Sequence, residues 1–168
     1  MRTVSEIRIL VSGLAWMGSG VGSIEAAIQE LLTSVQGEIL LTAYSIGQAD
    51  LIFELIEGAL SRGVKVRMVV NSLGEQHYSA QNRLKILQDK YPHFHLYSFE
   101  AGEERGNLHA KVIVADRQKA LIGSSNLSYS GMVVNHELAL LVSGMEAAEV
   151  ARAIDLLLGS KYCTQVKS

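Results

Sequence analysis

Residues 109–126 read HAKVIVADRQKALIGSSN, and the pattern within them decides the expected fold and chemistry of the chain. The mostly apolar residues 108–115 predict a strand. Because the side chains of a strand alternate between its two faces, His109 and Lys111 would lie together on one face. A turn and a second short strand, residues 120–123, then lead to a polar loop. The stretch therefore predicts two adjacent strands beside a cluster of reactive side chains.

These side chains suit the cleavage of a phosphodiester. An enzyme that works without a metal needs a nucleophile, donors for the phosphoryl oxygens and an acid for the leaving oxygen. The neutral imidazole of His109 can attack phosphorus near pH 7, which would form a covalent phosphohistidine for water to hydrolyse. Lys111 would bind a non-bridging oxygen, while Ser124 and Asn126 would donate to the same phosphate without adding charge. These residues predict a metal-independent phosphodiesterase.

Three further residues are expected to support this site. Glu137 is the nearest downstream carboxylate, and it would accept the second N–H of a histidine and so fix its tautomer. Asp116 is expected to brace a turn rather than to touch substrate, and Gly123 opens the turn that carries Ser124. The sequence contains no HExxH motif and no paired Cys/His spacing, so we expect no catalytic metal and no cofactor.

The rest of the chain alternates helical and strand patterns. Apolar residues at helical spacing predict helices over residues 23–35, 50–62, 79–91 and 146–158, with Ser23 and Asp50 as N-caps. Apolar runs predict further strands over residues 9–17, 38–46, 64–70, 94–99 and 136–142. This order predicts an α/β fold in which a mixed β-sheet is flanked by helices on both faces. Its last strands would add antiparallel pairs to an otherwise parallel arrangement.

Length and composition favour one globular domain spanning residues 1–168. The chain has 168 residues, 48% of them hydrophobic, which is enough for a substantial core. Its net charge of -2 argues against a strongly basic binder of nucleic acid, so any polyanion site must be local. No apolar run approaches the roughly 20 residues of a membrane span, so we expect a cytoplasmic protein without stable membrane association.

The motif residues also carry a family resemblance. Residues 109–116 match HxKxxxxD and residues 123–126 match GSxN, a combination that resembles the phospholipase D superfamily. The similarity extends from about residue 23 to residue 142, although Asn71 stands where relatives often carry Asp. The resemblance implies a phospholipase-D-like fold. It also implies a mechanism with two such motifs, in which one histidine attacks phosphorus and the other protonates the leaving group.

The chain carries only one copy of this motif. It therefore resembles the short, single-motif members of the superfamily, chiefly bacterial phospholipase-D-like nucleases, whose site forms across the two-fold axis of a homodimer. A two-fold interface is self-complementary, so it would bring His109, Lys111, Ser124 and Asn126 of both copies around one phosphate. The resemblance thus implies a homodimer with a shared active site.

Three functions remain open on the sequence alone. The first is a nuclease that hydrolyses DNA or RNA. The second is a phospholipid phosphodiesterase or phosphatidyl transferase, which would need an apolar mouth or an interfacial helix that the sequence does not clearly offer. The third is a non-catalytic nucleic-acid-binding module in a larger defence or restriction assembly, against which the intact His109 and Lys111 count.

Overall fold

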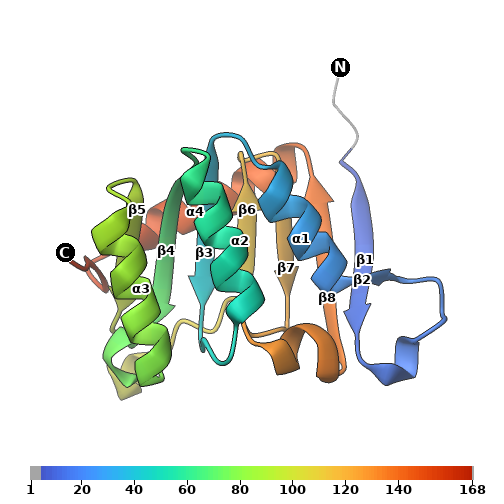
Figure 1. The fold of residues 1–168 in the computed structure, drawn as a ribbon, viewed down its shortest axis with the longest axis horizontal. Helices are drawn as coiled ribbons and strands as arrows, with labels where there is room; N and C mark the ends of the chain where they lie inside the picture. The colour runs from blue at the N-terminus through green and yellow to red at the C-terminus, as the bar shows by residue number, and fades with distance from the viewer. Residues whose placement is uncertain (1–4, 168) are drawn as a thin grey trace.

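The computed structural model describes residues 5–167, which form a nine-stranded sheet between helices (Figure 1). The strands are β1 (Ile7–Ser12), β2 (Gly22–Ser23), β3 (Glu38–Ala43), β4 (Lys65–Asn71), β5 (Phe94–Phe99), β6 (Val112–Ala115), β7 (Lys119–Gly123), β8 (Glu137–Ser143) and β9 (Cys163–Gln165). The helices are α1 (Ile24–Ser34), α2 (Asp50–Ser61), α3 (Tyr78–Lys90) and α4 (Met145–Leu158). A turn of π-helix, Ser130–Val134, follows the motif loop.

The sheet is mixed, with the strand order β2-β1-β8-β7-β6-β3-β4-β5-β9. Strands β3, β4 and β5 are parallel because α2 and α3 carry the chain back between them. Strands β6, β7 and β8 run antiparallel to their neighbours. As a result, β3, β4 and β7 end where β6 and β8 begin, at the lower end of the sheet as drawn in Figure 1.

Helices cover both faces of the sheet, as expected. Helices α1, α2 and α3 lie in front of it in Figure 1, and α4 passes behind it. Strand β3 is buried on both faces: Leu41 packs in the core under the front helices, whereas Leu40 packs in the core with Ile154 of α4. The predicted α/β fold with a mixed sheet is therefore confirmed.

Three of the four predicted helix starts differ by one residue from the structure, including α4, which begins at Met145 rather than residue 146. Ser23 does cap α1, since its side chain accepts a hydrogen bond from the N–H of Ala26 at 3.3 Å. Asp50, however, is the first residue of α2 rather than its N-cap, and its carboxylate pairs with Arg83 of α3. Helix α3 begins one residue before the predicted start, because His77 acts as its N-cap.

Some strands also begin or end at other residues than predicted, where a glycine turns the chain or a side chain replaces a backbone hydrogen-bond partner. Strand β1 ends at Ser12 rather than residue 17, because Gly13 turns the chain with a φ of 100°. The predicted strand over residues 108–115 pairs with its neighbours only from Val112 onward. The short strands β2 and β9 were not predicted, since two or three residues carry no readable alternation.

Candidate active site

The motif residues gather at the lower end of the sheet. His109 and Lys111 immediately precede β6, Ser124 directly follows β7, and Glu137 is the first residue of β8. Because β6, β7 and β8 are consecutive antiparallel neighbours, the start of one strand lies beside the end of the next. The fold thus brings together side chains that are up to 28 positions apart in the sequence.

His109 and Lys111 are in direct contact. The Nζ of Lys111 lies 2.9 Å from Nδ1 of His109 and 2.9 Å from the carbonyl oxygen of the same residue. Lys111 is 9% exposed, and this burial lowers the pKa of its ammonium, while the charge of Glu137 raises it by less. Because an ammonium only donates hydrogen bonds, Nδ1 acts as the acceptor and the proton of a neutral His109 sits on Nε2.

Two side chains hold the backbone on either side of His109. Asn71, which is buried at the end of β4, accepts a hydrogen bond from the N–H of Leu108 through Oδ1 at 2.8 Å. The hydroxyl of Thr42 donates to the carbonyl of Ala110 at 2.9 Å and accepts from the N–H of Val112 at 3.0 Å. These side chains replace the strand ladder, which explains why β6 begins later than predicted.

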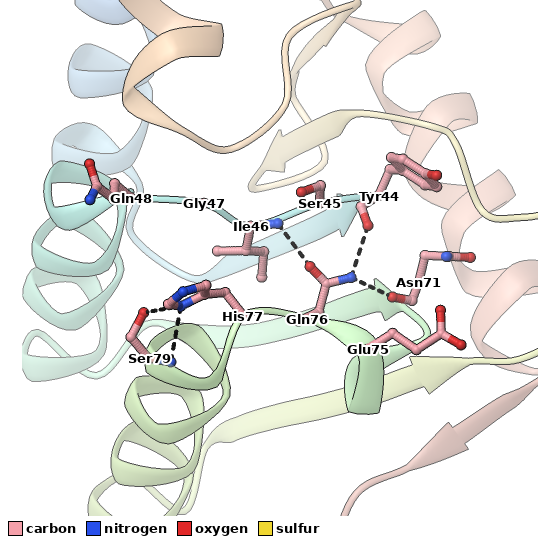
Figure 2. Close-up of a pocket in the computed structure, with 10 residues that line it drawn as sticks. All are labelled: Tyr44, Ser45, Ile46, Gly47, Gln48, Asn71, Glu75, Gln76, His77 and Ser79. Carbon is pink, nitrogen blue, oxygen red and sulfur yellow. Dashed lines mark hydrogen bonds between the residues drawn. The ribbon is translucent and has the colours of Figure 1, made fainter.

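Tyr44 and Gln76 complete the support of His109, and both were missed by the sequence analysis. The rings of Tyr44 and His109 pack with their centroids 4.4 Å apart. The amide of Gln76 donates to the carbonyls of Tyr44 and Asn71 at 3.1 and 2.8 Å and accepts from the N–H of Ile46 at 3.0 Å (Figure 2). Gln76 therefore ties together the two segments that touch His109. The sequence could have indicated this region, because Tyr44 and Asn71 stand where buried strands end, the usual location of ligand sites in such sheets.

Glu137 contacts Ser124 and not His109. The Ser124 hydroxyl donates to Oε2 of Glu137, and the N–H of Leu138 donates to the same hydroxyl at 3.3 Å. The expected hydrogen bond between Glu137 and His109 is not formed among residues 5–167. The reason lies in the strand order, because β7 separates β8, which carries Glu137, from β6, which His109 precedes.

The GSxN loop is shaped by close backbone packing. A Cβ on Gly123 would lie 2.6 Å from the Cβ of Ala139 on β8, so only glycine fits there. A Cβ on Gly131 would lie 2.5 Å from the carbonyl oxygen of Asn126, so the π-helical turn packs directly on the loop. The Oδ1 of Asn126 is buried and makes no hydrogen bond to any residue that the structure describes. Because an amide oxygen only accepts, donation to a phosphate would come from the N–H2 of Asn126.

Asp116 lies at the opposite, upper end of the sheet. Its carboxylate accepts hydrogen bonds from the backbone N–H groups of Gln36, Gly37 and Glu38 at 2.9, 2.7 and 2.9 Å. Burial raises the pKa of this carboxyl group, but the three donors together outweigh it and hold the pKa below its ordinary value. Asp116 thus joins the turn between β6 and β7 to the connection between α1 and β3, away from His109.

No three His, Cys, Asp or Glu side chains among residues 5–167 converge in a way that would hold a metal ion. None of the helices in this part of the chain combines the length and the apolar character needed to cross a membrane.

Comparison with known sequences relates most of the chain to one family. The family model described as "Cardiolipin synthase, PLD-like domain" matches residues 28–155. The DISARM protein DrmC of Bacillus paralicheniformis is 31% identical over 144 residues, which cover 84% of this chain and 58% of that protein. Cardiolipin synthase A of Buchnera aphidicola is 26% identical over 154 residues, which cover 89% of this chain and 30% of that protein. The chain thus spans less than two thirds of either relative.

Solved structures show the same fold. Nuc of Salmonella typhimurium, described as a phospholipase D family member, has a TM-score of 0.75 at 19% identity, covering 98% of this chain and 100% of that one. NucT of Helicobacter pylori has a TM-score of 0.75 at 20% identity, covering 96% and 100%. Phosphatidylserine synthase of Haemophilus influenzae has a TM-score of 0.77 at 15% identity, covering 99% and 41%. At these identities the likeness establishes a shared fold.

Proposed function

The chain belongs to the family of cardiolipin synthase, PLD-like domains, in the phospholipase D superfamily, and we propose that it is a metal-independent nuclease that cleaves DNA or RNA. The observation that carries this proposal is the direct contact between the exposed imidazole of His109 and the buried ammonium of Lys111. A nucleophile thereby stands next to a cation suited to a phosphoryl oxygen. Two structures with the same fold, Nuc and NucT, cover nearly all of this chain and are themselves fully covered by it.

The reaction begins when the phosphodiester displaces the ammonium from His109. Lys111 then binds a non-bridging oxygen, with Asn126 as a further donor and Ser124 as another once its hydroxyl hydrogen turns from Glu137 to the phosphate. Attack by Nε2 requires the proton of His109 to be on Nδ1, which the ammonium occupies in the free protein. After the ammonium has left, water takes the proton from Nε2 and returns one to Nδ1, so binding of the phosphate also prepares the nucleophile. A bond forms between Nε2 and phosphorus as the bond from phosphorus to the leaving oxygen breaks, and water later hydrolyses the phosphohistidine.

The leaving oxygen needs a proton from a second acid. His109 cannot supply it while bonded to phosphorus, so we assign this role to His109 of a second copy in a homodimer. Around residues 13–21, the apolar Leu14 and Met17 are 74% and 77% exposed and border a groove with Val134. A Cβ on Gly13, at the start of this segment, would lie 2.9 Å from the ring of His136, the residue before Glu137, so the two residues pack closely. We propose that the second copy covers this apolar surface, because it flanks the site and uncovered patches of this kind mark interfaces.

Glu137 is proposed to act within the same shared site. Within one chain, its carboxylate accepts the hydrogen bond from the Ser124 hydroxyl and so orients that hydroxyl beside the proposed phosphate site. Its negative charge also favours the charged form of Lys111, the cation that binds the phosphate. Its replacement by Gln is expected to lower kcat and raise KM for oligonucleotides, because Ser124 and Lys111 both contact the phosphate.

Substitution of His109 by Ala tests the nuclease. The His109→Ala protein should not cleave single-stranded DNA in EDTA, whereas His95→Gln, which changes a histidine on β5, should cleave like wild type. Cleavage by His109→Ala at the wild-type rate would refute the mechanism. If both copies supply a histidine, mixing equal amounts of the two proteins with subunit exchange should reduce the wild-type activity to about half, since mixed dimers are inactive. A strictly monomeric protein that is active would refute the shared site.

A lipid phosphodiester is the second candidate substrate. The matching family and one relative are both named for cardiolipin synthase, which favours this alternative. Incubation with phosphatidylcholine vesicles and, separately, with single-stranded DNA distinguishes the two, because a lipid enzyme should release the headgroup and leave the DNA intact. The third candidate, a binding module, is favoured by the relative named as a DISARM protein. It would be supported if the protein bound DNA while no phosphohistidine formed with any diester.

A further inference from the structure

A pocket of about 520 Å³ opens at the lower end of the sheet, between the segments that follow β3 and β4 (Figure 2). Its lining includes Tyr44, Ser45, Gln48, Asn71, Glu75 and Gln76. The volume lies within the range of about 300–1,000 Å³ that is usual for small-ligand sites. The phosphate chemistry proposed above does not use this pocket.

Residues that line the pocket contact both His109 and the GSxN loop. Tyr44 packs against the ring of His109, with 4.4 Å between the centroids. Two residues further along, Ile46 pairs with Leu127, and the N–H of Gly47 donates to the carbonyl of Leu127 at 3.3 Å. Leu127 directly follows Asn126 of the GSxN loop. A chemical group attached to a phosphate at His109 therefore reaches this pocket without crossing any other element.

The polar groups of the pocket are unsuited to a second phosphate. No Lys or Arg lines it, the Nδ1 of its histidine, His77, is already bonded to Ser79, and Glu75 presents an exposed carboxylate, which repels anions. The amides of Asn71 and Gln76 already bind the chain itself. By contrast, the side chains of Ser45 and Gln48 make no hydrogen bond to any residue between 5 and 167, so they are available to a ligand.

An aromatic wall, neutral hydrogen-bonding groups and one carboxylate match the chemistry of a nucleobase. Aromatic side chains stack on the faces of bases, and this stacking is a main source of affinity for single strands. Amide, hydroxyl and carboxylate oxygens accept the N–H groups at the edges of bases, and the amide also donates. A diacylglycerol has neither an aromatic face nor N–H groups, so the same lining suits a lipid poorly.

We infer that this pocket holds the nucleobase next to the scissile phosphate, against Tyr44 and within reach of Ser45, because Gln48 lies at the other end of the pocket (Figure 2). The inference rests on the proposed nuclease function and deepens it by naming the substrate as a single strand. A base in a duplex is stacked and paired, so it would have to be extruded before it entered the pocket. The phosphate is bound by the motif, and the base by residues outside it.

A comparison of substrates with and without the base tests this inference. The substrates are the deoxycytidine dinucleotide and its two analogues in which either base is replaced by an abasic tetrahydrofuran unit. For the wild-type protein, loss of the base on one side of the phosphate should raise KM about tenfold. In the Ser45→Ala variant the same loss should raise KM only about threefold, because the hydrogen bond to the base is removed while stacking on Tyr44 remains. Gln48→Ala, at the other end of the pocket, should keep the larger difference.

The matched control is Gln118→Ala, which removes an exposed glutamine in the turn at the upper end of the sheet. This control should keep the tenfold difference of the wild-type protein. An equal KM ratio in wild type and Ser45→Ala would overturn the inference. So would a wild-type KM that does not depend on either base, and this result would leave the nuclease proposal intact.

Failure of the nuclease proposal gives a different result. In that case the wild-type protein would cleave none of the three dinucleotides in EDTA. The affinities of the same dinucleotides for the His109→Ala protein, measured by calorimetry, then test whether the pocket binds a base, and this test needs no cleavage. A roughly tenfold preference for the base-containing form, reduced to about threefold in His109→Ala/Ser45→Ala, supports the inference, and equal binding of all three overturns it.

Discussion

Replacement of Asp116 by Ala should destabilise the protein without affecting its chemistry, although Asp116 belongs to the motif. The carboxylate holds three backbone N–H groups at 2.7 to 2.9 Å. Each lost hydrogen bond costs about 1 kcal/mol, since Gln36 and Gly37 are exposed and water can replace the carboxylate there. Asp116 also has a φ of 51°, a left-handed conformation that costs an Ala about 1 kcal/mol. The free energy of unfolding should therefore fall by about 4 kcal/mol.

Asp116→Asn is the matched variant. Asn tolerates a left-handed φ and keeps one acceptor oxygen, so its free energy of unfolding should fall by only about 1–2 kcal/mol. Urea unfolding measures both losses, provided that the slope with denaturant is unchanged. The pKa of Asp116 is lowered in the folded state, so its contribution is fully present above the ordinary carboxyl pKa of about 3.9 and is lost as pH falls below it. The stabilities of wild type and variants should accordingly converge in acid.

Activity provides the decisive contrast for Asp116. At a temperature where both variants are folded, kcat should equal that of wild type, because Asp116 lies at the upper end of the sheet. A fall in kcat of a hundredfold or more in fully folded Asp116→Asn would refute this assignment. Unchanged stability of Asp116→Ala would refute the energetic reasoning.

Two further predictions concern the support of His109. Burial lowers the pKa of Lys111, so kcat/KM should decline with rising pH before the ordinary lysine pKa of about 10.4 is reached, and Lys111→Arg should remove this decline from the pH profile. An alkaline limb that persists in Lys111→Arg would contradict this role. Asn71→Leu removes the acceptor for the N–H of Leu108 and should lower kcat about tenfold with little change in KM, whereas Asn71→Asp keeps the acceptor and should lose less. Equal kcat losses in both variants would contradict the positioning role.

The sequence alone determined the elements and the reactive residue types. Helices α1 and α2 and strands β3 and β5 follow from hydrophobic periodicity, which is a property of neighbours along the chain. The contact between His109 and Lys111 likewise follows from the alternation of an extended segment. Boundaries were less predictable where a side chain such as Thr42 replaces a backbone partner, because that substitution depends on a distant residue.

Only the tertiary structure decided which distant residues meet. The strand order places β7 between β6 and β8, so Glu137 meets Ser124 rather than His109. Strand β6 carries the chain from one end of the sheet to the other over roughly 13 Å, which separates Asp116 from the histidine of its own motif. The association of Tyr44 and Gln76 with His109 depends on the parallel pairing of β3 and β4. Such pairings arise from burial of the whole sheet between its helices, and no local spacing in the sequence encodes them.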